Sequence, residues 1–348
     1  MKLRVMALLG AALMLTAACG DSGEPASASG ESETAAAEEG VTLTVYSGRD
    51  EEFVGPLLEQ FTEDEGIELD VRYGDSAELA ATILEEGESS PADVFLSQDA
   101  GSLGAVAEEG LLTELDEEIL SQVEDRFRSP DGLWVGTSGR ARVAAYNTNN
   151  VSEDELPPSI LGFMAPAWKG RIGFAPTNSS FQAFVAAMIV TEGEEATRTF
   201  LEGIVANEPK TYEDNSSTVR AVADGEIDAG FVNHYYIYEV AAEDGEIPVA
   251  NHFFAGGDPG ALVNTAGVGI LASSANADAA QTFVEYLTGD AGQTYWAEET
   301  FEYPVVDGFE PKEELVPLDE IESPELDLSD LGGTLEPALQ LLAEVGLL

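Results

Sequence analysis

Residues 41–73 read VTLTVYSGRDEEFVGPLLEQFTEDEGIELDVRY, and this stretch decides the fold because it places an amphipathic helix between two short apolar strands. The same alternation continues as far as residue 109. We expect strands at 41–46, 67–73 and 93–96, and helices at 50–65, 76–86 and 99–109. This β-α-β-α-β order predicts an α/β protein with a parallel sheet, whose ligands bind at the carboxyl ends of the strands.

A second α/β unit follows a long extended stretch. Residues 134–146 are predicted to form one strand that passes between two lobes, and the alternation restarts at Arg171. Beyond this point we expect a strand at 172–174, a second crossing stretch at 260–271, and helices at 181–191, 277–288, 292–299 and 335–345. The predicted lobes comprise residues 41–142 with 266–315, and residues 143–265 with 316–348. Two α/β lobes joined by crossing strands imply a cleft between them.

The N-terminus predicts export and a lipid anchor. A short basic region precedes an apolar stretch, residues 5–18, that is too short to span a membrane. The stretch runs into LTAACG, which resembles a bacterial lipobox, so we expect a signal peptide over residues 1–18 and a lipidated Cys19. Residues 19–40 are small and polar and are expected to form a flexible tether. The anchored protein is therefore expected outside the cytoplasm, at the cell surface or in the periplasm.

The chain is strongly acidic. It contains 67 Asp and Glu residues against 14 Lys and Arg residues, which gives a formal net charge of −53. This balance excludes nucleic acid as a partner, because phosphate contacts need Lys and Arg. The acids are distributed along the whole chain, which is typical of a solvated surface adapted to high salt and not of one metal site.

The segment 233–238, NHYYIY, places two adjacent tyrosines where a helix is expected to begin. Asn233 is a favourable N-cap, and in a first helical turn Tyr235 and Tyr236 converge, whereas on a strand they would point to opposite faces. The positive end of the helix dipole favours their phenolates. Anionic oxygen donors suit a hard cation such as Fe³⁺, although two packed core aromatics would give the same pattern. His234 is expected to point away from the face that the two rings share.

Four further strand-to-helix junctions carry polar side chains. They are YSGRDE at 46–51, LSQDAG at 96–101, PTNSSF at 176–181 and DNSST at 214–218. Free backbone N–H groups at helix starts, helped by Asn and Ser side chains, form an anion site. Helix capping alone explains each junction taken singly. Because all of them fall at the cleft-facing ends of strands, together they predict an anion site beside the tyrosines.

Six ordered motifs connect these observations with a known family. They are VYSGR at 45–49, SPADVF at 90–95, SGRARV at 138–143, WKGRIG at 168–173, NHYY at 233–236 and DPGALV at 258–263. With these motifs the chain resembles the ferric-ion-binding lipoproteins and periplasmic proteins that serve ATP-driven iron importers. The resemblance implies a two-lobe type II periplasmic-binding-protein fold with transferrin-like lobes, an interlobe cleft and crossing hinge strands. It also implies a monomer that delivers Fe³⁺, or a small ferric chelate, to an ABC-type iron permease in the cytoplasmic membrane.

The same resemblance assigns the metal site. The family binds iron on two adjacent tyrosines, which correspond to Tyr235 and Tyr236 in this chain. Its histidine and glutamate ligands correspond to Asp50 and Gln98, of which the carboxylate is an acceptable ligand and the amide a poor one. A second subgroup uses a further tyrosine at the position of Phe181. The chain therefore keeps the pair of tyrosines but departs from the rest of the pattern.

The resemblance also implies an anion, phosphate or carbonate, that is bound together with the iron. Its expected contacts lie at helix starts near the tyrosines and are Asn178, Ser179, Ser180, Asn215 and Asn233. Arg140 and Arg142 lie two positions apart on the predicted crossing strand and therefore share one face. Arg140 is expected either to pair with the anion or to form a structural salt bridge.

Two other functions are compatible with parts of the sequence. A binding protein of the same fold could take a phosphonate, thiamine, a polyamine or another small ion in the same cleft. An enzyme would need an activated nucleophile or a paired acid and base. The only cysteine is Cys19, and the chain contains no G-x-S-x-G motif. We therefore expect a binding protein and not an enzyme.

Overall fold

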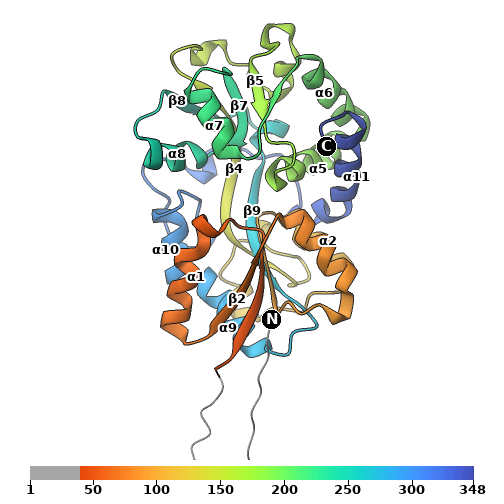
Figure 1. The fold of residues 1–348 in the computed structure, drawn as a ribbon, viewed down its shortest axis with the longest axis vertical. Helices are drawn as coiled ribbons and strands as arrows, with labels where there is room; N and C mark the ends of the chain where they lie inside the picture. The colour runs from red at the N-terminus through yellow and green to blue at the C-terminus, as the bar shows by residue number, and fades with distance from the viewer. Residues whose placement is uncertain (1–39) are drawn as a thin grey trace, which may run out of the picture. The chain divides into compact units, whose positions relative to one another are not determined.

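This computed structural model describes residues 40–348. They form a mixed β-sheet covered by helices (Figure 1). The predicted signal peptide and lipidation site Cys19 lie outside the described residues. The strands are β1 (Thr42–Ser47), β2 (Glu68–Tyr73), β3 (Val94–Ser97), β4 (Val135–Asn147), β5 (Ile172–Phe174), β6 (Lys210–Thr211), β7 (Ala229–Asn233), β8 (Val249–His252) and β9 (Val263–Ile270). The helices are α1 (Glu51–Glu65), α2 (Ser76–Glu86), α3 (Ala100–Glu108), α4 (Glu117–Leu120), α5 (Ser179–Glu192), α6 (Glu194–Ala206), α7 (Asn215–Ala223), α8 (Tyr236–Asp244), α9 (Ala277–Thr288), α10 (Asp290–Glu298) and α11 (Gly332–Glu344).

Strand β4 passes from one half of the sheet into the other (Figure 1). Between Val135 and Ala141 it pairs with β9, and from Arg142 onward it pairs with β7 and β8. We name the half built on β2, β1, β3, β9 and the start of β4 the first lobe, and the half built on the end of β4, β5, β6, β7 and β8 the second lobe. All 13 residues of β4 are buried. The predicted crossing strand is therefore confirmed.

In each lobe, parallel strands end at the same edge of the sheet. Strand β1 is parallel to β2 and β3, and β5 is parallel to β6 and β7. In the first lobe, the predicted parallel sheet is confirmed for β2, β1 and β3. Beyond them the sheet is mixed, because β9 is antiparallel to both β3 and β4. The carboxyl ends of β1 and β3 lead to Asp50 and Gln98, and that of β7 leads to the two tyrosines. This edge is where ligands bind in such sheets.

Helix α1 shows how the apolar pattern forms an element. Its buried residues, Val54, Leu57, Leu58 and Phe61, recur at intervals of three and four and therefore share one face. Gly66 ends the helix with φ 68°, a left-handed conformation that glycine adopts without strain. Helix α5 differs because its first ten residues, Ser179 to Met188, are all buried, and it packs against α6 and α11.

Helix α11 packs against α3 of the first lobe and α5 of the second. At its start, Gly332 faces Gly104 of α3 so closely that a Cβ on Gly332 would lie 2.5 Å from the carbonyl carbon of Gly104. The two backbones can approach this far only because neither residue carries a side chain. The last helix of the chain thus contacts both lobes.

One predicted boundary is wrong. Asn233 is the last residue of β7, Tyr235 occupies the N-cap position, and α8 begins at Tyr236. Asn233 stays extended because it pairs with Arg142 across the β4–β7 ladder. The two tyrosines nevertheless lie at the start of a helix, as predicted.

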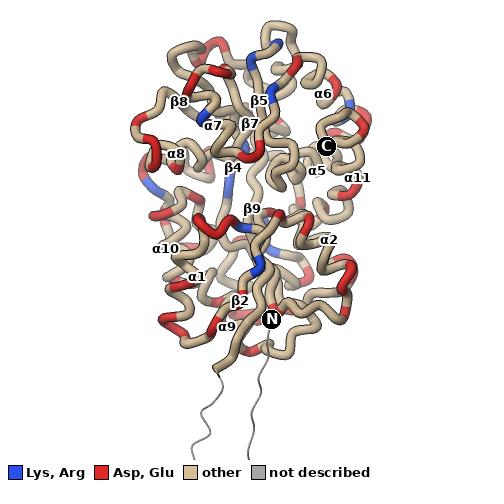
Figure 2. The backbone as a smooth tube through the Cα atoms, in the orientation of Figure 1, with Lys and Arg blue, Asp and Glu red and all other residues tan. Residues whose placement is uncertain are grey.

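Acidic residues are distributed over both lobes (Figure 2). Asp and Glu lie on helices and loops of each lobe, and Lys and Arg are sparse between them. Within residues 40–348, none of the helices combines the length and the apolar character needed to cross a membrane.

Candidate functional site

The two adjacent tyrosines lie together in the wall of a cleft between the lobes. Their ring centroids are 4.3 Å apart with the ring planes tilted by 32°, and Tyr235 and Tyr236 are 1% and 5% exposed. The cleft has a volume of about 590 Å³. From the first lobe it is lined by Arg49, Asp50, Glu51, Glu52, Phe53, Asp75 and Gln98, and from the second by Asn178, Glu213, Asp214, Ser216, Arg220, Tyr235, Tyr236, Glu239 and Glu243. The cleft is therefore rich in anionic and neutral oxygen atoms.

Burial controls the protonation of these tyrosines. It raises the pKa of Tyr235, an effect that the positive charge of Arg140 opposes. Burial also raises the pKa of Tyr236 well above its ordinary value, and the neighbouring Tyr235 adds to the rise. Burial thus opposes the ionisation of the two phenols that the helix dipole was expected to favour. A cation bound between the two oxygens would instead have to displace the protons.

Gln98 and Asp50 reach the same cleft from the first lobe. The Nε2 of Gln98 donates a hydrogen bond to the Tyr236 hydroxyl over 3.3 Å, so the two lobes are linked at the tyrosine itself. Asp50 precedes α1 and makes no capping hydrogen bond, which leaves its carboxylate available. The cleft walls partly desolvate the Asp50 carboxylate and raise its pKa; Arg49 opposes this rise, whereas the negative charge of Asp75 adds to it.

Three of the predicted anion contacts, Asn178, Ser180 and Asn215, form a hydrogen-bonded group at the starts of α5 and α7. Asn178 caps α5: its Oδ1 accepts hydrogen bonds from Ser180 N at 3.1 Å, from Ser180 Oγ at 2.6 Å and from Asn215 Nδ2 at 3.0 Å. Ser179 Oγ donates to Asp75 Oδ1 of the first lobe over 2.5 Å. Asn233 is buried beside this group, and its Nδ2 has no hydrogen-bond partner among the described residues.

Two buried arginines lie behind the tyrosines. Arg142 donates to Ser180 Oγ at 3.3 Å and to Phe231 O at 2.9 Å, and it pairs with no carboxylate of the described chain. Burial lowers the pKa of Arg142 to about 9. Arg140, Arg142 and Asn233 border one enclosed space of about 10 Å³, about the size of a single water molecule. Unpaired N–H groups around a closed polar space are suited to an anion or a water.

Glu302 was not predicted from the sequence. Its two carboxylate oxygens lie 2.9 Å from Arg49 and 2.9 Å from Arg140, and all three side chains are almost fully buried. The contact to Arg49 is a hydrogen bond, whereas the one to Arg140 is an ion pair without hydrogen-bond alignment. Arg140 thus forms the structural salt bridge that was one of its two expected roles. No pattern distinguishes Glu302 from the other acids of this chain.

His234 is held away from the cleft, as predicted. Its Nδ1 accepts a hydrogen bond from Ala141 N at 3.2 Å, and its Nε2 lies 2.9 Å from Phe301 O. The residue is fully buried, which lowers its pKa to about 4. A neutral imidazole with both nitrogens engaged is not available to a metal.

Glu239 was also missed. It lies on α8 and lines the cleft beside the tyrosines. Its Oε1 accepts a hydrogen bond from Ser216 Oγ at 2.8 Å, and burial raises its pKa to about 7. Its spacing of three and four residues from the tyrosines is a signal that could have identified it.

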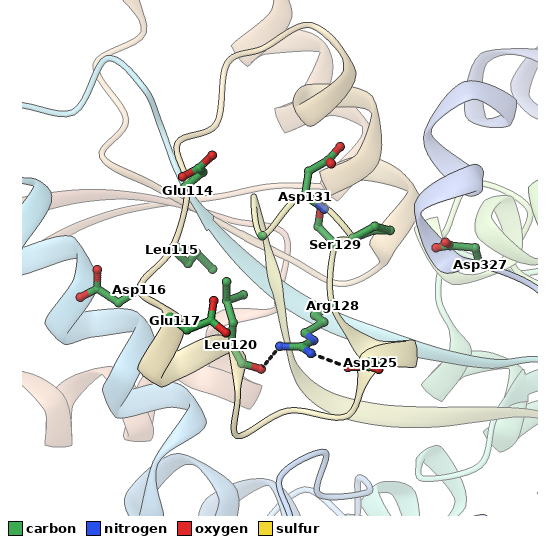
Figure 3. A pocket seen from close by; sticks show the side chains of 12 residues that line it. Glu114, Leu115, Asp116, Glu117, Leu120, Asp125, Arg128, Ser129, Asp131 and Asp327 are labelled. Atoms are coloured by element: carbon green, nitrogen blue, oxygen red, sulfur yellow. Dashed lines mark hydrogen bonds and ion pairs between the residues drawn. The ribbon is translucent and has the colours of Figure 1, made fainter.

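A larger cavity of about 910 Å³ lies elsewhere in the first lobe (Figure 3). Its wall carries several carboxylates, and its only cation, Arg128, donates hydrogen bonds to Leu120 O and Asp125. Among residues 40–348, no group of three His, Cys, Asp or Glu side chains is arranged to hold a metal. This cavity therefore gives no indication of a metal site, whereas the cleft offers tyrosine oxygens.

Comparison with known proteins relates this site to bacterial transport. The family of bacterial extracellular solute-binding proteins matches residues 89–321. The Fe(3+)-binding periplasmic protein of Serratia marcescens is 35% identical over 319 residues, which cover 91% of this chain and 93% of that protein. Iron-bound HitA from Pseudomonas aeruginosa has the same fold with a TM-score of 0.84 at 37% identity, over 88% of this chain and 99% of that one.

A third relative was solved with both iron and citrate. The Trichodesmium protein solved in complex with iron and citrate has a TM-score of 0.74 at 30% identity, over 88% of this chain and 100% of that one. These similarities confirm the predicted two-lobe type II periplasmic-binding-protein fold and the resemblance to ferric-ion-binding proteins. The chain belongs to the family of bacterial extracellular solute-binding proteins.

Proposed function

We propose that this protein binds Fe³⁺ in the cleft between its lobes and delivers it to an ABC importer. The observation that carries the proposal is the pair of buried tyrosines, whose rings lie 4.3 Å apart in a cleft lined by carboxylates. Phenolate and carboxylate oxygens are hard ligands that suit a trivalent metal. The Serratia relative is named for Fe(3+) binding and the Pseudomonas relative was solved with iron bound, which supports this choice.

The proposed metal ligands are Tyr235 and Tyr236 from the second lobe and Asp50 from the first, with Gln98 at hydrogen-bond distance from Tyr236. A synergistic anion, phosphate or carbonate, would bind at the starts of α5 and α7. Its proposed contacts are Asn178, Ser179, Ser180, Asn215, Asn233 and Arg140. The free Nδ2 of Asn233 and the unpaired N–H groups of Arg140 support an anion at this place.

Opening and closing of the lobes would control release. We propose lobes of residues 41–142 with 266–315 and of residues 143–265 with 316–348, joined through β4. Hydrogen bonds from Gln98 to Tyr236 and from Ser179 to Asp75 cross the cleft and would break when it opens. Hinge motion around a ligand is the usual mechanism of such two-lobe binding proteins.

The remaining parts of the proposal concern the cell envelope. Cys19 would carry a lipid that anchors the protein outside the cytoplasmic membrane, and residues 19–40 would tether the folded part to it. The partner would be an ABC-type iron permease, and the cargo free Fe³⁺ or a small ferric chelate. The relatives are named as binding proteins, which supports binding and transport and not catalysis. The protein would act as a monomer.

The first test is the colour of the ferric complex. Tyrosinate bound to Fe³⁺ absorbs visible light, so the wild type with Fe³⁺ should be coloured. Tyr235→Phe combined with Tyr236→Phe should abolish the band and weaken ferric binding by more than about 100-fold. Losing a residue that only orients a metal ligand already costs about 10- to 100-fold in affinity, and losing the ligands themselves should cost more. Fe³⁺ titration in competition with citrate measures the affinity.

Tyr238→Phe is the matched control. The Tyr238 ring stacks on Phe301 at 4.7 Å, and its hydroxyl donates to Glu314 O, away from the cleft. This variant should keep both colour and affinity. Retention of the band and of iron binding in the double variant would refute the proposal.

A second candidate is a small organic ion in the same cleft, without iron. The observation that favours it is Gln98, whose amide replaces the family's anionic ligand and donates to Tyr236. Calorimetry with ferric citrate, a phosphonate, thiamine and a polyamine separates the candidates, since only one class should bind tightly.

A further inference from the structure

We propose that Glu239 is an additional carboxylate ligand of the ferric ion in this chain. The inference rests on the proposed function and extends it, because it assigns a metal contact to a residue outside the pattern of two tyrosines, Asp50 and Gln98. With Asp50 it would supply carboxylate oxygens from both sides of the cleft.

The position of Glu239 on α8 directs it to the same side as the tyrosines. It follows Tyr236 by three residues and Tyr235 by four, and residues at these spacings are neighbours on a helix surface. All three side chains line the cleft, as does Asp50 of the opposite lobe. The helix start therefore carries two phenols and one carboxylate on the face that meets the cleft.

The carboxylate of Glu239 has no cationic partner among the described residues. Its Oε1 accepts a hydrogen bond from Ser216 Oγ at 2.8 Å, which orients the group and leaves Oε2 without a partner in the described chain. Arg220 also lines the cleft, but its guanidinium pairs with Glu243 and, over 2.8 Å, with Asp244. A cation bound beside this carboxylate would supply the counter-charge that it lacks in the described chain.

The chain also needs a carboxylate in this place. An amide such as Gln98 brings no negative charge, and its Nε2 already donates to the Tyr236 hydroxyl over 3.3 Å. Hard trivalent ions prefer anionic oxygen ligands. Glu239 can supply from α8 the negative charge that Gln98 does not bring.

The test compares Glu239→Gln with Asp244→Asn. Glutamine keeps the shape and can accept the Ser216 hydrogen bond but removes the negative charge. Asp244→Asn removes one negative charge from the same helix outside the cleft lining. Affinity is measured by Fe³⁺ titration against citrate, the tyrosinate band by visible absorption, and the folding of each metal-free variant by thermal melting.

Glu239→Gln should weaken ferric binding by about 10- to 100-fold and shift the tyrosinate-to-iron band, because a ligand of the metal is lost. Asp244→Asn should leave the band in place and change the affinity by less than about threefold, as expected for an exposed charge. If the wild type shows the band and both variants behave alike, Glu239 is not a ligand and the proposed function still stands. If the wild type shows no band with Fe³⁺, the proposed function itself fails.

Discussion

At the scale of single residues, His234 holds in place the chain segment that leads into the two tyrosines. Its ring bonds to Ala141 N and Phe301 O and stacks on Tyr303 with a centroid distance of 4.5 Å. The residue before Tyr235 is thereby tied both to β4 and to the segment that follows α10. This arrangement requires a neutral imidazole, because the Ala141 N–H needs an acceptor.

The buried His234 predicts acid sensitivity. Its pKa is about 4 in the folded protein, against an ordinary value of 6.5. Between these values the unfolded chain binds a proton that the folded protein does not, so the free energy of unfolding falls as the pH falls. The expected loss between pH 7 and pH 4 is about 2–3 kcal/mol from this residue.

Chemical denaturation of the wild type and His234→Gln at pH 7, 5.5 and 4.5 measures this contribution. Glutamine can both accept and donate, so the difference between the two proteins should shrink as the pH falls. His252→Gln removes the other imidazole. Because His234 remains in this variant, its free energy of unfolding should fall with pH as that of the wild type does. A difference that does not change with pH would contradict the prediction.

At the scale of elements, the contact between α3 and α11 depends on two glycines. A Cβ on Gly332 would meet Gly104 C at 2.5 Å and Ala105 N at 2.7 Å, which are backbone atoms that cannot rotate away. Gly332→Ala should therefore separate the helices and lower the free energy of unfolding by about 1–3 kcal/mol. Thermal melting of the metal-free protein measures the effect.

Gly333→Ala is the matched control at the next position. A Cβ there meets only carboxylate atoms of Glu108, at 3.2 Å and beyond, and this side chain can move. Alanine also favours the helix, so the variant should be neutral or more stable by up to about 1 kcal/mol. Equal destabilisation by both substitutions would show that the close approach is unimportant.

Most elements could be predicted because their patterns are local. The apolar spacing of α1 and the continuous apolar character of β4 follow directly from the faces that these elements bury. The end of β7 could not be predicted, since Asn233 is held extended by its partner Arg142 from a distant part of the chain. The pair of tyrosines could be identified from their adjacency and Glu239 from its spacing to them, whereas Glu302 differs from the other acids only by its three-dimensional surroundings.

At the scale of the whole molecule, the excess of acid predicts salt-dependent stability. A formal charge of −53 on a chain with few cations creates repulsion that is relieved on unfolding. Raising the ionic strength from 0.1 to 1 M shortens the Debye length from about 10 Å to 3 Å and screens most of this repulsion.

The melting temperature should accordingly rise by at least about 4 °C between 0.1 and 1 M NaCl, which corresponds to one or two kcal/mol for a protein of this size. KCl should act like NaCl, because screening depends on ionic strength and not on the identity of the cation. A melting temperature that is independent of salt would contradict the prediction, and a difference between the two salts would indicate specific ion binding.

Glu302 has a consequence for the motion of the lobes. It holds Arg49 and Arg140, while its neighbours Phe301 and Tyr303 bond to His234 and Gly139, so segments from both lobes meet within a few residues of one buried carboxylate. The Arg49–Glu302–Arg140 group belongs wholly to the first lobe and stays intact as the lobes move, and the contact of His234 with Phe301 joins the second lobe directly beside it. Domain movement should therefore be a rotation whose axis passes near Glu302, with small displacements at that point and the largest ones at the rim that carries Asp75 and Ser179.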